Sequence, residues 1–251
     1  MRITTLNLNG LRSATRKGFK KWLSQVETDV ICLQEVRSEP GDIEAGLLDG
    51  WQMHWNPAEK KGYAGTAILT RKDGVFQKGC ELERANKEGR VSGFSMPEME
   101  VWSIYFPSGT SGEEKQAWKI EFLTWIRPWL DRKLQSGRPV VVCGDINIAH
   151  TAKDIKNAKA NEKNSGFLPE ERKWLTDLFA SGWRDAFREK YPDLIAYSWW
   201  TIRGNAYANN VGWRIDYFFV SKEAQSLVAN AGIHMDVMGS DHCPIELDLK
   251  L

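Results

Sequence analysis

Carboxylates, amides and a histidine stand at the ends of several short apolar runs in this sequence. These polar clusters contain Asn7, Asn9, Gln34, Glu35, Asp145, Asn147, Asp216, Asp241 and His242. A carboxylate in or beside a core strand is costly unless it is paired or bound to a metal ion. We therefore expect these side chains to converge on one site.

Hydrolysis of a phosphoester is the chemistry that suits this set of side chains. An anionic phosphodiester resists attack, so an enzyme must neutralise its charge, orient a water molecule and donate hydrogen bonds to the developing negative charge. Carboxylate and amide oxygens are hard ligands, which favour Mg²⁺, with Mn²⁺ as a substitute, over zinc. The cysteines Cys32, Cys80, Cys143 and Cys243 show no zinc-binding spacing.

Each of these residues also has an ordinary structural interpretation. Asn7 and Asn9 alone would be typical turn or helix-cap residues. Asp145 follows Gly144, which is a common turn sequence, and a lone histidine such as His242 is more often structural than catalytic. The joint order of these residues along the chain is what favours the functional interpretation.

The elements that must position these residues are predicted to be alternating strands and helices. Short apolar and β-branched runs predict strands at 1–9, 30–34, 66–70, 101–106, 139–143, 217–221 and 245–251. Helices are predicted at 15–24, 113–134 and 169–180, with Pro128 expected to bend or break the second. Because no low-complexity linker or shift in composition interrupts them, we expect one α/β domain over residues 1–251.

The polar stretch 151–166 is predicted to be a long loop. It carries Lys153, Lys156, Lys159 and Lys163. Most charge runs of this kind are solvated surface. The alternative is a loop that follows a nucleic-acid backbone, because lysine contacts to phosphates supply affinity.

The composition limits the kinds of partner and location. Lys and Arg number 34 and Asp and Glu 33, so the net charge of +1 argues against a protein that simply coats DNA. The 12 tryptophans are many, and some could be stacking surfaces for nucleotides. The first ten residues lack the apolar stretch of a signal peptide, and no run approaches the ~20 apolar residues of a membrane span. With no paired cysteine spacing, we expect reduced thiols and a cytoplasmic location.

Taken together, the motifs resemble the exonuclease III family of AP endonucleases, within the DNase I-like superfamily of phosphoesterases. The resemblance covers nearly the whole chain through NLNGLR (7–12), CLQE (32–35), KGYAGTAI (61–68), EGR (88–90), IYFPSG (104–109), CGDINIAH (143–150), NSGFLPEER (164–172), NVGWRIDYFFVS (210–221) and GSDHCPI (239–245). It implies an α/β (α+β) fold of four layers. In that fold two facing, mostly antiparallel sheets are covered by outer helices.

The resemblance also implies a metal site and a base. Glu35 matches the principal Mg²⁺ ligand of the family. Asp241 and Asn9 would lie beside it and contact the metal directly or through water. Asp145 matches the aspartate that orients or deprotonates the attacking water.

Further roles in the reaction are implied for neighbouring motifs. Asn147 and Asn7 would hold phosphate oxygens or the aspartate. His242 would contact the scissile phosphate, with Asp216 fixing its tautomer and favouring its charged form. Tyr105 would donate a hydrogen bond to the phosphate or assist the leaving group, although a tyrosine in such a strand is usually a core residue.

Residues that contact DNA can be placed by the same resemblance. Asn161 and Asn164 match loop positions that contact phosphates around a lesion. Trp199 and Trp213 match the aromatic wall that receives an extruded abasic sugar, although the family commonly has Phe at the first position. Arg203 is the candidate for a side chain inserted into the DNA groove, and its ordinary interpretation is an exposed arginine.

The expected activity is Mg²⁺-dependent hydrolysis of the phosphodiester 5′ to an abasic site, by a monomer acting on double-stranded DNA. The nearest alternative is an enzyme of 3′ ends, a 3′–5′ exonuclease or 3′-phosphatase that also acts on blocked 3′ ends. A non-catalytic regulator that binds RNA or protein is a second alternative, which the complete set of carboxylates disfavours. A phosphatase of lipids or small phosphoesters is a third, and the tryptophans of the carboxy-terminal motif favour DNA over it.

Overall fold

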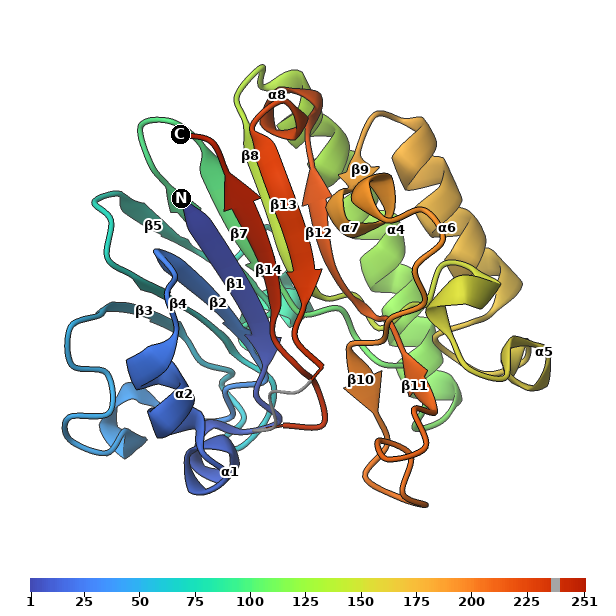
Figure 1. Ribbon diagram of the computed structural model, residues 1–251, viewed down its shortest axis with the longest axis horizontal. Helices are drawn as coiled ribbons and strands as arrows, with labels where there is room; N and C mark the ends of the chain where they lie inside the picture. Colours follow the sequence, from blue (N-terminus) through green and yellow to red (C-terminus); the bar gives the residue numbers. More distant parts are fainter. Residues whose placement is uncertain (236–239) are drawn as a thin grey trace.

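Two six-stranded sheets face each other in the structure, a computed structural model that describes residues 1–235 and 240–251 (Figure 1). The first sheet has the strand order β13 (Val228–Ile233), β14 (Ile245–Leu249), β1 (Arg2–Asn7), β2 (Val30–Gln34), β4 (Thr66–Thr70) and β3 (Gln52–Asn56). The second has the order β5 (Val75–Lys78), β6 (Val91–Ser95), β7 (Glu100–Ile104), β8 (Val140–Asp145), β12 (Asp216–Val220) and β9 (Arg184–Asp185). Each sheet contains one parallel pair, β1 with β2 and β7 with β8, and is otherwise antiparallel, as predicted.

Helices lie around the two sheets, on their outer faces, at their ends and in the connecting loops (Figure 1). They are α1 (Leu11–Arg16), α2 (Phe19–Gln25), α3 (Glu83–Lys87), α4 (Glu113–Gln135), α5 (Ala158–Asn161), α6 (Pro169–Ala180), α7 (Ala186–Lys190) and α8 (Lys222–Gln225), with 3-10 turns at Pro40–Asp42 and Ala152–Asp154. Apolar residues of α1 and α2 pack on the first sheet, and those of α4 and α6 pack on the second. The predicted four-layer arrangement is confirmed.

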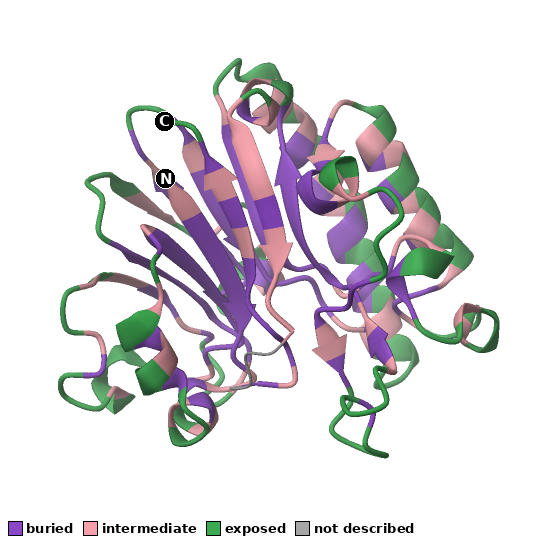
Figure 2. Cartoon of the chain, viewed as in Figure 1, coloured by how far each residue is buried: buried purple, intermediate pink, exposed green. Residues whose placement is uncertain are grey.

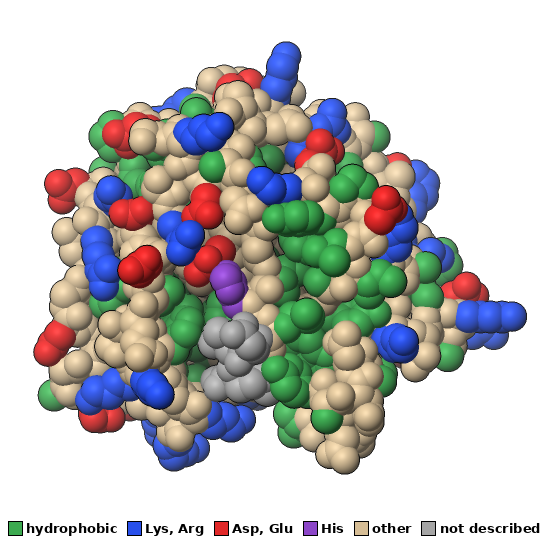
Figure 3. Space-filling view, viewed as in Figure 1, with side chains coloured by type: hydrophobic (Ala, Val, Ile, Leu, Met, Phe, Trp, Pro, Cys, Tyr) green, Lys and Arg blue, Asp and Glu red, His purple; other side chains and the backbone are tan. Residues whose placement is uncertain are grey.

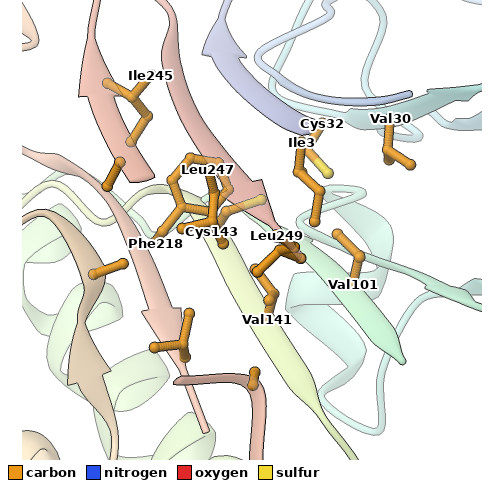
Figure 4. Packing of buried hydrophobic residues seen from close by; sticks show 14 of the residues in the cluster. Ile3, Val30, Cys32, Val101, Val141, Cys143, Phe218, Ile245, Leu247 and Leu249 are labelled. Carbon is orange, nitrogen blue, oxygen red and sulfur yellow. The ribbon is translucent and has the colours of Figure 1, made fainter. Parts of the chain in front are cut away.

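Alternation along the central strands explains why the layers form. In β2, Val30 and Cys32 face the opposite sheet, whereas Ile31 and Leu33 face the helices, and all four are fully buried. Strand β8 likewise places Val141 and Cys143 in the cluster between the sheets, and Val140 and Val142 in the cluster beneath α4 and α6. Figure 4 shows the cluster between the sheets, and Figure 2 shows that the central strands are buried along their length. Strands buried on both faces must be apolar on both, which accounts for their continuous apolar sequences.

The predicted helix at 15–24 is instead two short helices. Helix α1 ends at Arg16 and α2 begins at Phe19. Between them Gly18 has φ +108°, a backbone conformation that residues other than glycine rarely adopt. The prediction was wrong because Phe19, Trp22 and Leu23, on which it rested, all follow this glycine. Their helical spacing gives no reason to extend the same helix back to residue 15.

Helix α4 runs through Pro128 without interruption, so of the bend or break predicted there, the break does not occur. Proline removes one hydrogen bond to the carbonyl of Thr124. Both Pro128 and Thr124 are exposed, so water can satisfy that carbonyl at little cost. The predicted helix at 169–180 coincides with α6.

The predicted loop 151–166 contains the 3-10 turn Ala152–Asp154 and the short helix α5. A buried ion-pair network fixes it: Asp154 accepts hydrogen bonds from Arg214 Nε at 2.7 Å and from an Arg188 Nη at 2.6 Å. The same arginine, Arg214, also donates from one Nη to Asp185 at 2.7 Å. Arg214 directly follows the ribbon of β10 (Trp199–Trp200) and β11 (Gly212–Trp213), so the network ties the loop to this ribbon.

We expect the Asp154 carboxylate to contribute pH-dependent stability. Burial alone would raise the pKa of Asp154, but the charges of Arg214 and Arg188 outweigh it and hold that pKa well below its ordinary value. Such a carboxylate contributes stability that is complete above its unfolded-state pKa, about 4, and is lost as the pH falls through its folded-state pKa. The stability lost in Asp154→Asn, on the order of 2–3 kcal/mol at pH 7, should therefore shrink below about pH 4.

Urea unfolding at pH 7, 4 and 3 would measure this difference. Asp193→Asn is the matched control, because its exposed carboxylate also pairs with a cation, Lys153, at 2.6 Å. It should unfold like the wild type at each pH. A difference for Asp154→Asn that stays constant down to pH 3 would contradict the prediction.

The first and last strands lie side by side in the first sheet. Strand β1 pairs with β14, the Leu249 N–H donates to the Met1 carbonyl at 2.8 Å, and both termini lie at the same end of the sheet (Figure 1). None of the helices in the described ranges is long and apolar enough to cross a membrane.

Candidate active site

A cleft of about 510 Å³ opens where β1, β2 and β8 end. It is lined by Asn9, Glu35, Arg37, Tyr105, Ser108, Thr110, Asp145, Asn147, Ser165, Gly166, Trp199, Thr201, Arg203, Trp213, Ile215, Asp241 and His242. Ten of the fourteen predicted site residues are in this lining. Two more, Asn7 and Asp216, lie directly behind it and hydrogen-bond to residues that line it.

Asn7 joins the two sheets at the base of the cleft. Its fully buried Nδ2 donates to Glu35 Oε1 and to Asp145 Oδ2, both at 2.8 Å. Its Oδ1 accepts the Asn9 backbone N–H at 2.9 Å. A single amide therefore fixes two carboxylates that come from facing sheets, which a structural turn residue would not do.

Several residues of the cleft have left-handed backbones. The φ angles are +46° at Asn9, +47° at Glu35, +49° at Arg37 and +56° at Asn147. Left-handed backbone costs free energy for residues other than glycine, and such strain gathers at functional sites because the surrounding structure enforces it. In each case the chain turns sharply after a strand and directs the side chain into the cleft.

A chain of hydrogen bonds and one ion pair crosses the floor of the cleft. Asn147 donates to Asp145 from its backbone N–H at 2.9 Å and from Nδ2 at 3.2 Å. His242 Nε2 lies 3.8 Å from Asp145 Oδ2, and its Nδ1 donates to Asp216 at 2.8 Å. Ser198 Oγ donates to the same Asp216 oxygen at 2.6 Å.

These contacts set the protonation of the chain. Burial opposes the charged form of His242, but the charge and hydrogen bond of Asp216 outweigh it and raise the pKa of His242 to about 10. Burial raises the pKa of Asp145 to about 8; the His242 charge opposes this, and the charges of Asp216 and Glu35 add to it. A cationic imidazole beside a carboxylate of high proton affinity can bind a phosphate and accept a proton from water.

A hard divalent cation fits the acidic end of the cleft. Glu35, Asp145, Asp216 and Asp241 bring four carboxylates together, against the cations Arg37 and His242. Asp241 is held by Asn9 Nδ2 at 2.9 Å and by Trp199 Nε1 at 3.0 Å, which leaves lone pairs of its oxygens for a ligand. Within residues 1–235 and 240–251, no group of three or more His, Cys, Asp or Glu side chains is placed to hold a metal ion by itself. An open set of two carboxylates, Glu35 and Asp241, with the Asn9 amide suits an ion that retains several waters.

Tyr105 lies just beyond the end of β7, and its ring lines the cleft. The Arg90 guanidinium lies 4.5 Å from the ring centroid, and Arg90 also donates to the Tyr105 carbonyl at 3.0 Å. Burial, together with the charge of Glu35, raises the pKa of Tyr105 well above its ordinary value. The hydroxyl therefore keeps its proton and can act as a donor.

Two tryptophans form an aromatic corner of the cleft beside Asp241. Trp199 and Trp213 face each other across the ribbon of β10 and β11, with ring centroids 6.0 Å apart and an interplanar angle of 90°. The Trp213 ring lies over Gly166, where a Cβ would come within 2.8 Å of it. Arg203 reaches the same cleft from the loop that joins the two strands, and its neighbour Ile202 is 83% exposed.

Asn161 and Asn164 lie outside the cleft, at and just after α5. The Asn164 Nδ2 donates to the Asn161 side chain at 2.8 Å, and the Asn161 Nδ2 donates to the Asn157 carbonyl at 3.0 Å. Lysine and arginine side chains project from the part of the surface that α5 forms (Figure 3). A phosphate contact there would have to come from DNA that extends beyond the cleft.

Sequence reasoning missed two functional positions. Arg37 pairs with Glu35 and lines the cleft. It reaches the cleft because its backbone is left-handed, which the sequence does not indicate. Ser198 supports Asp216 from 18 residues away, through the contact of the ribbon with β12. Neither residue belongs to a motif whose type or spacing signals its position.

Comparisons with known proteins agree with this geometry. The profile of the Endonuclease/Exonuclease/phosphatase family matches residues 4–242. The chain is 40% identical to an exodeoxyribonuclease of Bacillus subtilis over the full length of both, and 37% identical to the DNA repair nuclease APEX1 of Danio rerio, covering 100% of this chain and 83% of that protein. The solved structure of the AP endonuclease LMAP from Leishmania major has a TM-score of 0.88 at 27% identity, covering 100% of this chain and 87% of the other.

The family match spans nearly the whole chain, and the fold agrees over the full length of the chain. The relatives named above are all nucleases that act on DNA. The chain therefore belongs to the endonuclease/exonuclease/phosphatase family of hydrolases, within its branch of DNA repair nucleases.

Proposed function

We propose that this protein is an AP endonuclease that hydrolyses the phosphodiester 5′ to an abasic site in double-stranded DNA, using Mg²⁺ with Mn²⁺ as a substitute. The observation that carries the proposal is the combination of residues that line the cleft. A set of carboxylates suited to phosphoryl transfer lies beside an aromatic corner suited to a sugar without a base. Extruding a baseless nucleotide sacrifices little pairing, so such a corner selects abasic sites over intact ones.

Glu35, Asp241 and Asn9 would hold the metal ion. When bound, the ion supplies positive charge that neutralises the phosphate and stabilises the charge developing on it. Arg37, which pairs with Glu35, brings further positive charge to this end of the cleft.

Asp145 would accept a proton from the attacking water. The water oxygen forms a bond to phosphorus, the bond to the 3′ oxygen of the preceding nucleotide breaks, and that oxygen takes up a proton from solvent to become a hydroxyl. The products are a 3′-hydroxyl and a 5′ abasic sugar phosphate. Asn7 and Asn147 hold Asp145 so that its carboxylate faces the water rather than rotating away.

His242 and Tyr105 would donate hydrogen bonds to the phosphate oxygens. The Asp216 carboxylate keeps His242 cationic and aims its Nε2 toward the cleft. Charge-assisted donors that are fixed before the reaction stabilise the transition state without a cost of reorganisation.

DNA would be held around the cleft by residues of three segments. Trp199 and Trp213 receive the abasic sugar, and Arg203 reaches from the tip of the ribbon into the groove that the extruded nucleotide leaves. Asn161 and Asn164 contact phosphates farther along the strand. The same proposal includes a single domain over residues 1–251, action as a monomer and a cytoplasmic location, which the free thiols of all four cysteines suit.

A second candidate is an enzyme that acts mainly on 3′ ends, as an exonuclease or a 3′-phosphatase on blocked ends. The name of the Bacillus subtilis relative, exodeoxyribonuclease, favours it. The same catalytic set would serve both reactions, since each breaks a phosphoester by attack of water.

Cleavage of a 5′-labelled duplex with one abasic-site analogue tests the proposal. An undamaged duplex with a recessed 3′ end is assayed beside it, with Mg²⁺ and with EDTA. We expect one Mg²⁺-dependent cut at the lesion, faster than loss of nucleotides from the undamaged end. Glu35→Ala should abolish the cut, and Glu39→Ala, at an exposed position four residues later, should not.

A ladder from the 3′ end with little cleavage at the lesion would favour the second candidate. If neither substrate were cleaved, both candidate functions would be contradicted.

A further inference from the structure

We infer that Trp199, in addition to forming one wall of the sugar pocket, is a positioning residue for the metal ligand Asp241. The inference rests on the metal site of the proposed function. Its central observation is the hydrogen bond that the Trp199 indole Nε1 donates to Asp241 Oδ2 at 3.0 Å. A tryptophan that only formed a wall would present its ring faces and leave the carboxylate to other donors.

The Asp241 carboxylate is fixed from two directions. Asn9, after β1, donates to Oδ1 at 2.9 Å, and Trp199, on β10, donates to Oδ2 at 3.0 Å. Ser240 Oγ also donates to Oδ1, at 3.1 Å, so Trp199 is the donor on Oδ2 opposite two donors on Oδ1. Donors on both oxygens restrict rotation of the carboxylate and leave the remaining lone pairs in a fixed direction. Partners of this kind behind a metal ligand commonly change metal affinity or activity 10–100-fold when they are removed.

The backbone supports the same contact. The Trp200 N–H donates to the Asp241 carbonyl at 3.0 Å, and the Cys243 N–H donates to the Ser198 carbonyl at 2.9 Å. An isolated bridge pairs Trp199 with His242. The strand that carries the aromatic wall is therefore hydrogen-bonded directly to the segment that carries the metal ligand, so the indole is held in line with the carboxylate.

The contact depends on the indole and not merely on an aromatic ring. Phenylalanine, which the resembled family commonly has at this position, would form a wall but has no N–H to donate. Trp213 provides the contrast within this protein. It forms the other wall, at 90° to Trp199, and within the described residues its indole N–H makes no contact with Asp241.

Binding of Mn²⁺ to the protein without DNA tests this role. Free Mn²⁺ is measured by electron paramagnetic resonance during titration of the wild type, Trp199→Phe and Trp213→Phe. We expect Trp199→Phe to weaken Mn²⁺ binding by about 10-fold or more, and Trp213→Phe to change it by less than about twofold. Because no substrate is present, loss of the sugar-pocket wall does not affect the measurement.

Thermal unfolding of the three metal-free proteins checks that both variants are folded at the titration temperature. Equal Mn²⁺ affinity of Trp199→Phe and the wild type would overturn the inference and leave the proposed function intact. Equal weakening in both variants would also overturn it, since that would indicate a general disturbance of the ribbon. A wild type that binds no Mn²⁺ would overturn both the inference and the metal site.

Discussion

Asp145→Asn is expected to slow cleavage at an abasic site by about 10³-fold, because the amide cannot accept the proton of the attacking water. The substitution keeps the shape of the side chain, and the donors on Asn7 and Asn147 can still meet its remaining carbonyl oxygen. Single-turnover cleavage of the labelled abasic duplex measures the rate. Binding of the same duplex, followed by fluorescence anisotropy in EDTA, should be retained.

The same variant should be more stable than the metal-free wild type. The folded-state pKa of Asp145, about 8, lies above its ordinary value because of burial and the neighbouring carboxylates. Such a group contributes stability below its unfolded-state pKa that is lost as the pH rises through the folded-state pKa. The gain in melting temperature of Asp145→Asn in EDTA should therefore grow from pH 5 to pH 8. A variant with wild-type cleavage would refute the role of Asp145, and a gain that shrinks with pH would refute the electrostatic explanation.

Lys119→Met is expected to destabilise the protein by about 3–5 kcal/mol, because it leaves the buried Glu171 carboxylate unpaired. Lys119 Nζ and Glu171 Oε1 are 2.8 Å apart, and both side chains are 0% exposed. Lys119 also donates to the Asn147 carbonyl at 2.8 Å, and Glu171 accepts the Gly166 N–H at 2.6 Å. The pair therefore connects α4 to the loop after β8 and to the segment beneath Trp213, and its loss should slow cleavage as well.

Urea unfolding compares this variant with a matched control. Lys173→Met removes the lysine of an exposed pair with Asp177, 2.7 Å apart on α6, and should cost no more than about 1 kcal/mol. The double variant Lys119→Met/Glu171→Gln should recover part of the lost stability, since no unpaired charge remains in it. Equal unfolding midpoints for Lys119→Met and Lys173→Met would show that the buried pair contributes no more stability than the exposed pair.

The strands that the sequence predicts are mostly buried, although β6, which is also buried, was not predicted because glycine and serine interrupt its apolar residues. The seven predicted strands correspond to β1, β2, β4, β7, β8, β12 and β14, with ends that differ by at most two residues. Three of the strands that were not predicted, β3, β5 and β13, lie at the edges of the sheets and are only partly buried. An edge strand needs no continuous apolar run, so its sequence resembles that of a loop.

In the site, too, the sequence predicts the residues that their own strands position, and it misses those that contacts between distant segments position. Asn7 and Asp145 are the last residues of buried strands and Glu35 directly follows one, so the ends of those strands indicate their common position. Arg37 reaches the cleft only through an unusual backbone, and Ser198 only through a ribbon of two-residue strands. Asn161 and Asn164, placed by resemblance alone, lie outside the cleft, and their contact with DNA stays a prediction.

The pairing of the first strand with the last has a consequence for the synthesis of this enzyme. Strand β1, which carries Asn7 at its end, lies between β2 and β14. A nascent chain therefore cannot complete its first sheet, or bring Asp241 and His242 to Glu35 and Asp145, until the segment that carries these two residues and β14 has left the ribosome. Contacts this distant in sequence also form slowly. Fragments that end before this segment would thus lack an assembled cutting site.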